Sequence, residues 1–410
     1  MRELRALLAE PARVEDSPAA PPTRELSIFV SCAEVSGEIH AVNLVRALRA
    51  ELAELGAPPA RFFGFGGRAL ADQGVELVGN PVERAAMGFD VVHALPFYLR
   101  LLAGGLRELA ARRADVAVLV DSPALHVPFG RMARRQGVRV VHFVTPQYWG
   151  WAPWRVDGYR DAVDLSLSIL PFEKAWFDRR GVRCRHVGHP LLDALPERVP
   201  PFAAPERRAL ALLPGSREGV LARNLPWMLS IVVEHLRADP ELVVIVPHER
   251  RELGPRIEAL VRDALVATPE LAPRVRVELG DLHGSLGRAK AAFSVSGTAL
   301  LDLLHHRLPT VVIYRLAHRR EIWMSRRFLT APYFASINLL AAREVCPEFC
   351  FVGDGPRAEV AAAVRRALVD PAWRETCRGG LELARERLGP AGACRRAARA
   401  LLCTALESTR

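Results

Sequence analysis

Residues 114–121 read ADVAVLVD, a continuous apolar run that ends in an acid, Asp121. A run without alternation of polar and apolar residues is typical of a strand covered on both faces, as in a parallel sheet. Similar runs occur at residues 26–32 (LSIFVSC) and 138–144 (VRVVHFV), and a helical pattern at 40–52 follows the first of them. Strands that alternate with helices predict a parallel sheet wrapped by helices.

The alternation starts again beyond a proline-rich stretch at residues 196–205, which is the best candidate for a linker. We therefore predict an α/β protein with two doubly wound, Rossmann-like domains that face a cleft. The expected segments are a disordered leader at 1–24, a first domain at 25–199, a second domain at 206–385 and a C-terminal helix at 386–410.

The composition excludes several classes of protein. Of 410 residues, 50% are hydrophobic and 25% charged, which is neither disordered nor fibrous. No apolar run reaches the roughly 18 residues that a membrane span needs. Seven cysteines, an odd number spread thinly, indicate reduced thiols in the cytosol. Cys346 and Cys350 lie four apart but have no second Cys/His pair nearby, so we expect no metal site.

The charge is strongly positive. Only Lys174 and Lys290 are lysines, so 54 of the 56 basic residues are arginine, and the net charge is +10. Such a surface suits phosphate-bearing ligands, anionic lipid or nucleic acid. No recognisable nucleic-acid-binding motif accompanies the charge, so we expect no nucleic-acid partner.

Ligands of open α/β sheets bind at the carboxyl ends of the strands. Glu34 follows the first strand, in a turn whose glycine permits close approach of an anion. The competing interpretation is helix capping, with Ser36 as the N-cap and Glu38 favoured in the first turn by the helix dipole. Asp121 directly ends a buried strand, where it could act as a general base or simply cap the next helix. Both alternatives stay open for both acids.

Aromatic residues crowd a third strand end, at residues 145–155 (TPQYWGWAPWR). Aromatic faces suit sugar rings or acyl chains, although core packing explains at least one of the tryptophans.

In the second half, two glycine turns follow predicted strands. Residues 213–217 (LPGSR) offer backbone N–H groups and a guanidinium to a diphosphate, through Gly215, Ser216 and Arg217, without forming a Walker loop. A similar turn could take phosphate on Ser296, Gly297 and Thr298 and a ribose hydroxyl on Asp302. Asn338 precedes an apolar pair, a position that a turn residue with no further role would also explain.

Taken in order, these segments resemble the lipid-A-disaccharide synthase family, of the GT-B glycosyltransferases (family 19), over roughly residues 26–400. The segments that carry the resemblance are AEVSGEIHA, FFGFGGRALADQGVE, MGF at 87–89, ADVAVLVDSP, VTPQYWGWAPWRV, ILPFEKAWF, VGHPLLD, LLPGSRE, SVSGTALLD and SINLLA.

The resemblance implies transfer of 2,3-diacylglucosamine from UDP to the 6-hydroxyl of 2,3-diacylglucosamine 1-phosphate, with inversion and without metal or other cofactor. It places the family's important acids on Glu34 and Asp121, its phosphate-binding arginine on Arg217 and its cleft asparagine on Asn338. It also implies a cytoplasmic protein on the inner face of the membrane. A homodimer stays open.

The sequence departs from the family pattern most clearly after the strand that ends at Asp121. Family members usually show a DxPDFN-like run after the strand, whereas this chain has Ala124 and His126 in place of the second acid and the asparagine. Two smaller departures are Asp302 where the family usually has glutamate, and Glu218 next to Arg217. The first departure favours, as an alternative, a non-catalytic binder of acylated sugar nucleotides. Another GT-B enzyme, such as a UDP-GlcNAc 2-epimerase or the transferase that builds lipid II, is the second alternative.

Acylated substrates require access to a bilayer surface. Residues 91–113 combine apolar side chains with arginines, and Pro96 and Gly104-Gly105 argue against one regular helix there. We expect a short basic amphipathic element that binds an anionic membrane surface, with packing on the first sheet as the equal alternative. The expected apolar anchors are Leu95, Phe97, Tyr98, Leu101 and Leu102, and the expected basic residues are Arg100, Arg107, Arg112 and Arg113.

Overall fold

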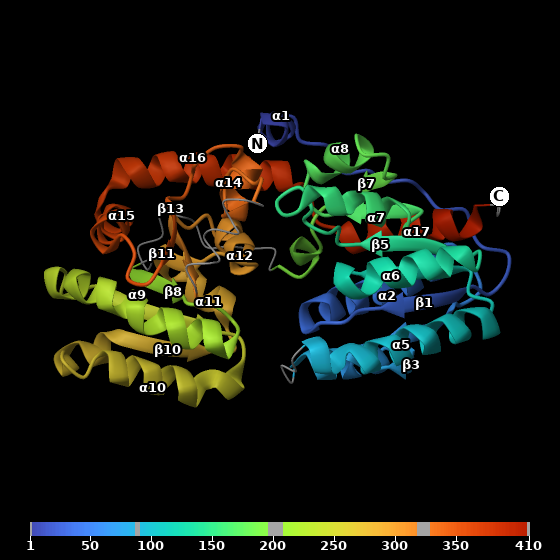
Figure 1. Ribbon diagram of the computed structural model, residues 1–410. Helices are drawn as coiled ribbons and strands as arrows, with labels where there is room; N and C mark the ends of the chain where they lie inside the picture. Colours follow the sequence, from blue (N-terminus) through green and yellow to red (C-terminus); the bar gives the residue numbers. More distant parts are fainter. Residues whose placement is uncertain (1, 87–90, 196–207, 318–328, 408–410) are drawn as a thin grey trace. The chain divides into compact units, whose positions relative to one another are not determined.

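The computed structural model describes residues 2–86, 91–195, 208–317 and 329–407 and divides the chain into two units (Figure 1). The N-terminal unit contains Glu10–Ala194 and Leu388–Arg410, and the C-terminal unit contains Met1–Ala9 and Leu195–Arg387. Each unit holds one parallel sheet with helices, which confirms the prediction of two doubly wound α/β domains.

The sheet of the N-terminal unit has seven strands in the order β3-β2-β1-β4-β5-β6-β7. The strands are β1 (Ser27–Ser31), β2 (Arg61–Phe65), β3 (Glu76–Gly79), β4 (Val116–Val120), β5 (Arg139–Phe143), β6 (Leu165–Ser168) and β7 (Cys184–His186). The chain runs outward from β1 to β3 and then returns to build β4 to β7 on the other side. The strand order therefore reverses between β1 and β4, where such sheets bind their ligands.

Helices connect these strands and cover the sheet. They are α2 (Val35–Glu54), α3 (Arg68–Ala71), α4 (Pro81–Ala86), α5 (Val91–Ala111), α6 (Pro123–Arg135), α7 (Val156–Arg160), α8 (Glu173–Asp178) and α17 (Ala393–Leu406), with the short 3₁₀ turns η1 (Pro153–Arg155) and η2 (Pro190–Asp193). Helix α17 packs on α2, and α5 packs on α6.

Helix α5 is continuous, contrary to our expectation that Pro96 and the two glycines would interrupt it. A Cβ on Gly105 would lie 2.4 Å from Cζ of Phe65 and 2.9 Å from Cε2 of Phe129. Glycine is therefore present because the helix approaches the aromatic core closely at this point, and not because the helix ends there. Pro96 lies near the start of the helix and removes a single i→i−4 hydrogen bond, a cost that the rest of the helix tolerates.

The sheet of the C-terminal unit has six strands in the order β10-β9-β8-β11-β12-β13. They are β8 (Ala209–Leu213), β9 (Val243–His248), β10 (Val275–Leu279), β11 (Ala289–Val295), β12 (Thr310–Leu316) and β13 (Glu348–Val352). The order reverses between β8 and β11, as it does between β1 and β4 in the other unit. This unit also contains α9 (Glu218–Ala238), α10 (Gly254–Ala264), α11 (Leu282–Gly287), α12 (Ala299–His305), α14 (Ser336–Ala341), α15 (Arg357–Val369), α16 (Pro371–Leu388) and the 3₁₀ turns η3 (Arg251–Leu253) and η4 (Pro269–Arg274).

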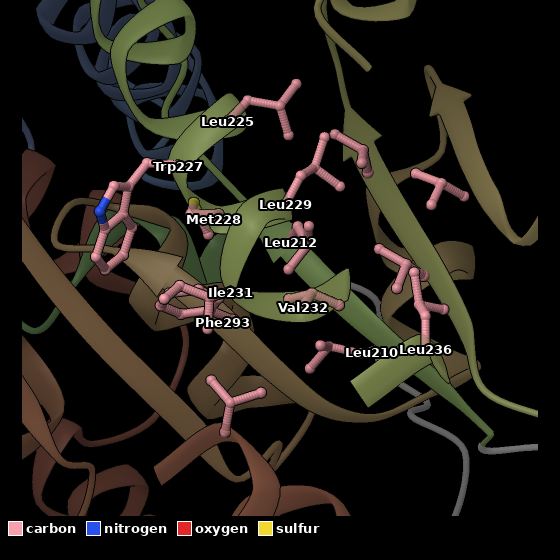
Figure 2. Packing of buried hydrophobic residues seen from close by; sticks show 14 of the residues in the cluster. Leu210, Leu212, Leu225, Trp227, Met228, Leu229, Ile231, Val232, Leu236 and Phe293 are labelled. Carbon is pink, nitrogen blue, oxygen red and sulfur yellow. The ribbon is translucent and has the colours of Figure 1, made fainter. Parts of the chain in front are cut away.

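The core of the C-terminal unit forms where α9 covers the sheet (Figure 2). Leu225, Met228 and Val232 project from α9 toward strand residues Leu212 and Phe293, and all five are fully buried. Each such side chain contributes roughly 1.5–3 kcal/mol when it is removed from water. The packed helix begins at Glu218, directly after the predicted diphosphate turn, so the core fixes where that turn lies.

The N-terminal segment is ordered, whereas we expected a disordered leader at residues 1–24. Residues Arg2–Ala9 form helix α1, and its Leu4, Leu7 and Leu8 are buried. These leucines lie on one helical face, which is the apolar stripe that lets so short a helix dock. Farther on, the backbone N–H of Glu15 donates to the carbonyl of His186 at 2.7 Å.

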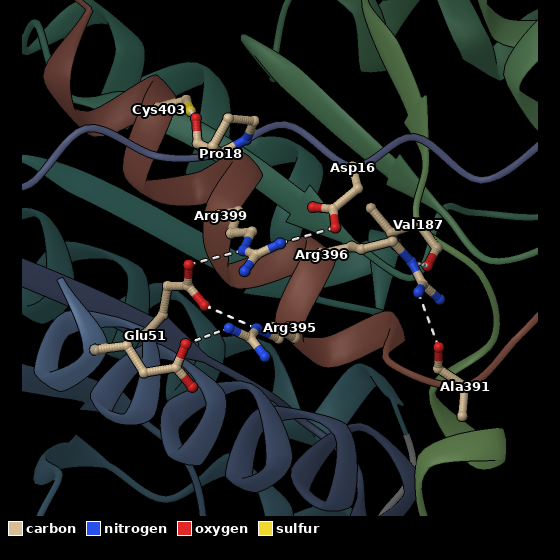
Figure 3. A network of polar contacts seen from close by, with 10 residues as sticks. Asp16, Pro18, Glu51, Val187, Ala391, Arg395, Arg396, Arg399 and Cys403 are labelled. Atoms are coloured by element: carbon tan, nitrogen blue, oxygen red, sulfur yellow. Dashed lines mark hydrogen bonds and ion pairs between the residues drawn. The ribbon is translucent and has the colours of Figure 1, made fainter.

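The C-terminal helix α17 belongs to the N-terminal unit and is held there by arginines (Figure 3). The carboxylate of Glu51 on α2, only 4% exposed, accepts from Nε of Arg399 at 2.7 Å and from Nε of Arg395 at 3.1 Å. Arg396 donates through Nε to the carbonyl of Val187 at 2.7 Å. The second sequence domain therefore ends before the last helix, which returns to complete the first.

Candidate functional site

The carboxyl ends of β1 and β4 lie side by side, since Ser31 pairs with Leu119 in the sheet. The first turn of α2 packs onto this edge: a Cβ on Gly37 would lie 3.5 Å from the carbonyl oxygen of Val120 and 3.8 Å from Cβ of Asp121. The structure therefore brings the Glu34 turn and Asp121 together at the point where the strand order reverses.

Glu34 is the N-cap residue of α2 and is exposed, with extended backbone angles. Its carbonyl accepts the first helical hydrogen bond, from the N–H of Glu38 at 2.9 Å, while its carboxylate does not cap the helix. The capping interpretation had placed the N-cap at Ser36, and the structure moves it two residues earlier. The carboxylate of Glu34 is thus not used for capping.

Glu38 has a role that sequence reasoning missed. Its buried carboxylate accepts from the backbone N–H groups of Gly67 at 2.9 Å and Leu70 at 3.0 Å, at the start of α3. It therefore stabilises the turn after β2 rather than the dipole of its own helix. No local pattern could have revealed this bond, because its partners are about 30 residues away in the chain.

Asp121 and Ser122 both adopt left-handed backbone conformations, with φ of 55° and 45°. The N–H of Asp121 donates to the carbonyl of Phe143 at 3.0 Å. Its own carbonyl lies 2.6 Å from Nδ1 of His126 and 2.9 Å from Nε2 of His142. His126 is thus buried beneath the site.

Two polar atoms next to Asp121 are buried and have no hydrogen-bond partner among the described residues. They are Oγ of Ser122 and Nδ1 of His40. Burial lowers the pKa of His40, and the nearby Asp121 carboxylate acts in the opposite direction. Buried polar atoms are normally paired. These atoms therefore mark positions where a polar group of a ligand or a water molecule would be stabilised.

The aromatic segment divides into packed and exposed members. Trp149 is buried and donates from Nε1 to Oε1 of Glu173 at 2.9 Å, whereas Trp151 and Trp154 are 36% and 58% exposed. Burial raises the pKa of Glu173 to about 7. Trp149 therefore packs in the core, as one interpretation of the sequence predicted. Trp151 and Trp154 are partly exposed to solvent.

In the C-terminal unit the carboxyl ends of β8 and β11 are adjacent, with Leu213 paired to Ser294. Gly215 has φ of 114°, and a Cβ there would lie 2.6 Å from Cγ1 of Val220. Ser216 and Arg217 follow it and are exposed, and Arg217 is the N-cap residue of α9. The amides of the first turn of this long helix thus follow the glycine turn directly.

Asn224, one turn further along α9, was not predicted. Its side-chain nitrogen donates to the carbonyl of Pro214 at 3.2 Å, so it holds the turn that precedes the helix.

The second glycine turn follows β11. Ser296 donates its hydroxyl to the carbonyl of Phe334 at 2.8 Å, so this hydroxyl helps to hold the chain and keeps only acceptor capacity for a ligand. Gly297 and Thr298 are exposed, and a Cβ on Gly297 would meet no atom within 4 Å. Asp302 is only 9% exposed, and burial, assisted by the charge of Glu249, raises its pKa to about 7.

Asn338 is placed differently from the other predicted residues. It is fully buried; its Oδ1 accepts from the N–H groups of Val345 at 2.8 Å and Cys346 at 2.9 Å, and its Nδ2 lies 3.1 Å from Oε2 of Glu348. The Glu348 carboxylate in turn accepts from the N–H of Ala335 at 2.8 Å. The structure gives Asn338 a role in holding the chain around Glu348 rather than an exposed amide.

Within the described ranges, no group of three or more His, Cys, Asp or Glu side chains is arranged to hold a metal ion.

Solved structures of other proteins have a similar fold. A putative UDP-N-acetylglucosamine 2-epimerase from Listeria monocytogenes is similar with a TM-score of 0.55 and 14% identity, over 87% of this chain and 91% of its own. MurG from Acinetobacter baumannii is similar with a TM-score of 0.52 and 12% identity, over 92% of this chain and 99% of its own. The chain therefore has the same fold as these two proteins, the GT-B fold.

Comparison of the sequence with known proteins shows the family to which the chain belongs. The family model described as "Lipid-A-disaccharide synthetase" matches residues 28–368. The lipid-A-disaccharide synthase of Myxococcus xanthus is 36% identical over 92% of this chain and 96% of its own length. That of Acidobacterium capsulatum is 33% identical over 89% and 92%. The chain belongs to the lipid-A-disaccharide synthase family.

Proposed function

We propose that this protein transfers 2,3-diacylglucosamine from UDP to the 6-hydroxyl of 2,3-diacylglucosamine 1-phosphate, forming lipid A disaccharide 1-phosphate and UDP. Family membership over most of the chain carries this proposal. The geometry supports it, because acids gather at one strand-order reversal and glycine turns at the other. These are the two kinds of group that a glycosyl acceptor and a nucleoside diphosphate need.

The proposed reaction is a single in-line displacement at the anomeric carbon, with inversion. Asp121 accepts the proton of the acceptor hydroxyl as the C–O bond to the sugar forms. Glu34, exposed on the neighbouring turn, orients the acceptor. The alternative in which Glu34 is the base and Asp121 the orienting group is kept. The unpaired atoms of Ser122 and His40 are suited to bind polar groups of the acceptor sugar.

The leaving UDP develops negative charge on its diphosphate. In this proposal the turn at Gly215, the first amides of α9 and the guanidinium of Arg217 stabilise that charge, together with the turn at Gly297. The residues present can supply this stabilisation without a divalent cation, so we propose a metal-independent reaction. Asp302, whose pKa burial raises to about 7, would bind a ribose hydroxyl of the uridine.

We also propose that the protein works at an anionic membrane surface on the cytoplasmic face, since both substrates are acylated. None of the helices in the described part of the chain combines the length and apolar character that a membrane crossing requires. On α5, Leu95 and Leu99 are 57% and 56% exposed and lie one turn apart on the same face. Leu101 is only 7% exposed and packs toward Gly79, so it belongs to the core and not to the expected anchor.

Arg112, one of the expected basic residues, forms ion pairs within the protein. Arg112 binds Glu76 and Glu108, at 2.6 and 2.7 Å, so its charge is compensated. Of the other expected anchors, Phe97, Tyr98 and Leu102 are half-buried. The proposed membrane contact therefore rests on these exposed residues: Leu95, Leu99, Arg100, Arg107 and Arg113.

The test uses purified protein with UDP-2,3-diacylglucosamine and radiolabelled 2,3-diacylglucosamine 1-phosphate. We expect a labelled disaccharide phosphate and an equal amount of UDP, with the rate unchanged by EDTA. Formation of UDP-ManNAc from UDP-GlcNAc alone would instead identify a 2-epimerase. Binding of both substrates without product would identify a non-catalytic protein.

A further inference from the structure

The strand end that presents Asp121 is conformationally costly. Asp121 and Ser122 are consecutive residues other than glycine with φ of 55° and 45°. Each left-handed residue of this kind costs on the order of 1 kcal/mol, so the surrounding structure must hold the pair in place. The hydrogen bonds of the Asp121 backbone show what holds this turn.

Two imidazole rings contact the carbonyl oxygen of Asp121. Nδ1 of His126, from α6, lies 2.6 Å away, and Nε2 of His142, from β5, lies 2.9 Å away. Both histidines are 1% exposed, and their ring planes cross at 73°. A carbonyl oxygen has two lone pairs, and both are thus occupied.

Only a nitrogen that carries hydrogen can bond to a carbonyl. Burial lowers the pKa of both histidines, that of His126 to about 3, so both rings are neutral near pH 7. A neutral imidazole has one donor and one acceptor nitrogen. His126 must therefore carry its proton on Nδ1, and His142 must carry its proton on Nε2.

The second nitrogen of each ring has a matching donor. Nε2 of His126 accepts from the hydroxyl of Ser31, the last residue of β1, at 2.8 Å. Nδ1 of His142 accepts from the hydroxyl of Tyr159 at 2.9 Å, and Tyr159 is bonded in turn to Ser166 on β6 at 2.5 Å. The network therefore has one consistent direction and connects β1, β5 and β6 to the Asp121 carbonyl at the end of β4.

We propose that His126 and His142 are positioning residues, which donate to the two lone pairs of the Asp121 carbonyl and thereby fix the direction of its carboxylate. This role rests on the proposed function only in taking Asp121 as a group that acts on the acceptor. It also accounts for the departure at residue 126, where family members usually carry asparagine. An asparagine side-chain nitrogen is separated from Cα by the same number of bonds as Nδ1 of histidine, so either residue can supply the donor.

The two donor nitrogens lie at different distances from the backbone, so asparagine and glutamine should have opposite effects at the two histidines. Asparagine places its nitrogen where histidine has Nδ1, and glutamine places its nitrogen near Nε2. We expect His126→Asn and His142→Gln to keep kcat within about threefold of the parent. His126→Gln and His142→Asn misplace the donor and should lower kcat roughly 10- to 100-fold, with KM values within about twofold.

A buried histidine away from this carbonyl provides the control. His186 lies on β7, and its Nδ1 faces the carbonyl of Ser168 at 3.2 Å. His186→Asn and His186→Gln should not differ in kcat. Thermal midpoints measured on all six variants separate lost folding from lost positioning. If asparagine and glutamine have equal effects at both 126 and 142, the two histidines only fill space and the proposal is wrong.

The hydrogen positions can be measured without any turnover. In protein labelled with ¹⁵N-histidine, the imidazole nitrogen shifts should show a neutral Nδ1–H form for His126 and a neutral Nε2–H form for His142. Assignment follows from the loss of each signal in the corresponding variant. The opposite forms, or a charged ring at pH 6, would overturn the proposal even in an active enzyme. The expected forms in a parent without transferase activity would contradict the proposed function and leave the geometry of the two donors intact.

Discussion

Gly215 lies so close to Val220 that a Cβ at the glycine would approach Cγ1 of the valine to 2.6 Å. The glycine also has φ of 114°, which side chains rarely allow. The turn after β8 is thus held by two independent constraints, one from its own backbone and one from the first turn of α9. The proposed diphosphate site therefore depends on a glycine that need not touch the ligand.

Gly215→Ala should destabilise the protein by about 1–3 kcal/mol, because it adds both strain and overlap. Gly219→Ala is the matched control, since no atom lies within 4 Å of a Cβ there and alanine favours helix. Urea unfolding of both variants measures the difference. Equal stabilities for the two variants would show that the turn rearranges freely.

Arg217→Ala should weaken UDP binding roughly 10- to 100-fold, because a charge-assisted hydrogen bond contributes about 1.5–3 kcal/mol. Arg237→Ala, at the exposed far end of the same helix, should leave UDP affinity unchanged. Calorimetric titration with UDP measures both. If the Arg217 variant binds UDP as the parent does, the diphosphate lies elsewhere.

The stability of the C-terminal unit should depend on pH through Asp302. Burial raises the pKa of Asp302 in the folded state to about 7, above its ordinary value of 3.8. The Asp302 carboxyl therefore stays protonated to a higher pH in the folded state than in the unfolded state. The protein therefore loses stability as pH rises from about 4 to 7, on the order of a few kcal/mol in total. Asp302→Asn should remove this loss.

The check is to compare the unfolding midpoints of the parent and Asp302→Asn at pH 5 and pH 8. The variant should gain stability relative to the parent at pH 8. Glu249→Gln should have a smaller effect in the same direction, because Glu249 adds to the raised pKa. Parallel pH curves for the parent and Asp302→Asn would remove Asp302 as the titrating group.

On α5, the double change Leu95→Ser and Leu99→Ser should reduce binding to phosphatidylglycerol vesicles at least ~10-fold without loss of folding, since both leucines are exposed. Added salt should weaken the binding of the parent. Val266→Ser removes an apolar side chain that is 73% exposed in the C-terminal unit and should have no effect. Undiminished vesicle binding by the double variant would place the membrane contact on another surface.

The prediction from sequence was strongest for the central strands and weakest for bonds between distant segments. Buried central strands are continuous apolar runs, so their ends, including Asp121, could be located. The edge strands β3 and β13 were missed because they are only partly buried, so they are not continuous apolar runs. The bond of Glu38 to Gly67 and the burial of Asn338 depend on tertiary contacts that no local pattern encodes.

The histidine at 126 illustrates the same limit. In the sequence it looked like the loss of a family residue. In the structure its Nδ1 lies 2.6 Å from the carbonyl oxygen of Asp121, where we propose that it donates. A substitution at a strand end is therefore better judged by the bond it makes than by its residue type.

The central claim is that Asp121 takes the proton from the acceptor hydroxyl, and the single-turnover rate of Asp121→Asn tests it most directly. The asparagine keeps the shape and the backbone of the residue but cannot accept the proton. With saturating UDP-2,3-diacylglucosamine and acceptor, we predict a rate roughly 10²- to 10⁴-fold below the parent, with UDP affinity and thermal midpoint unchanged. A rate within tenfold of the parent would contradict the claim and transfer the role of base to Glu34.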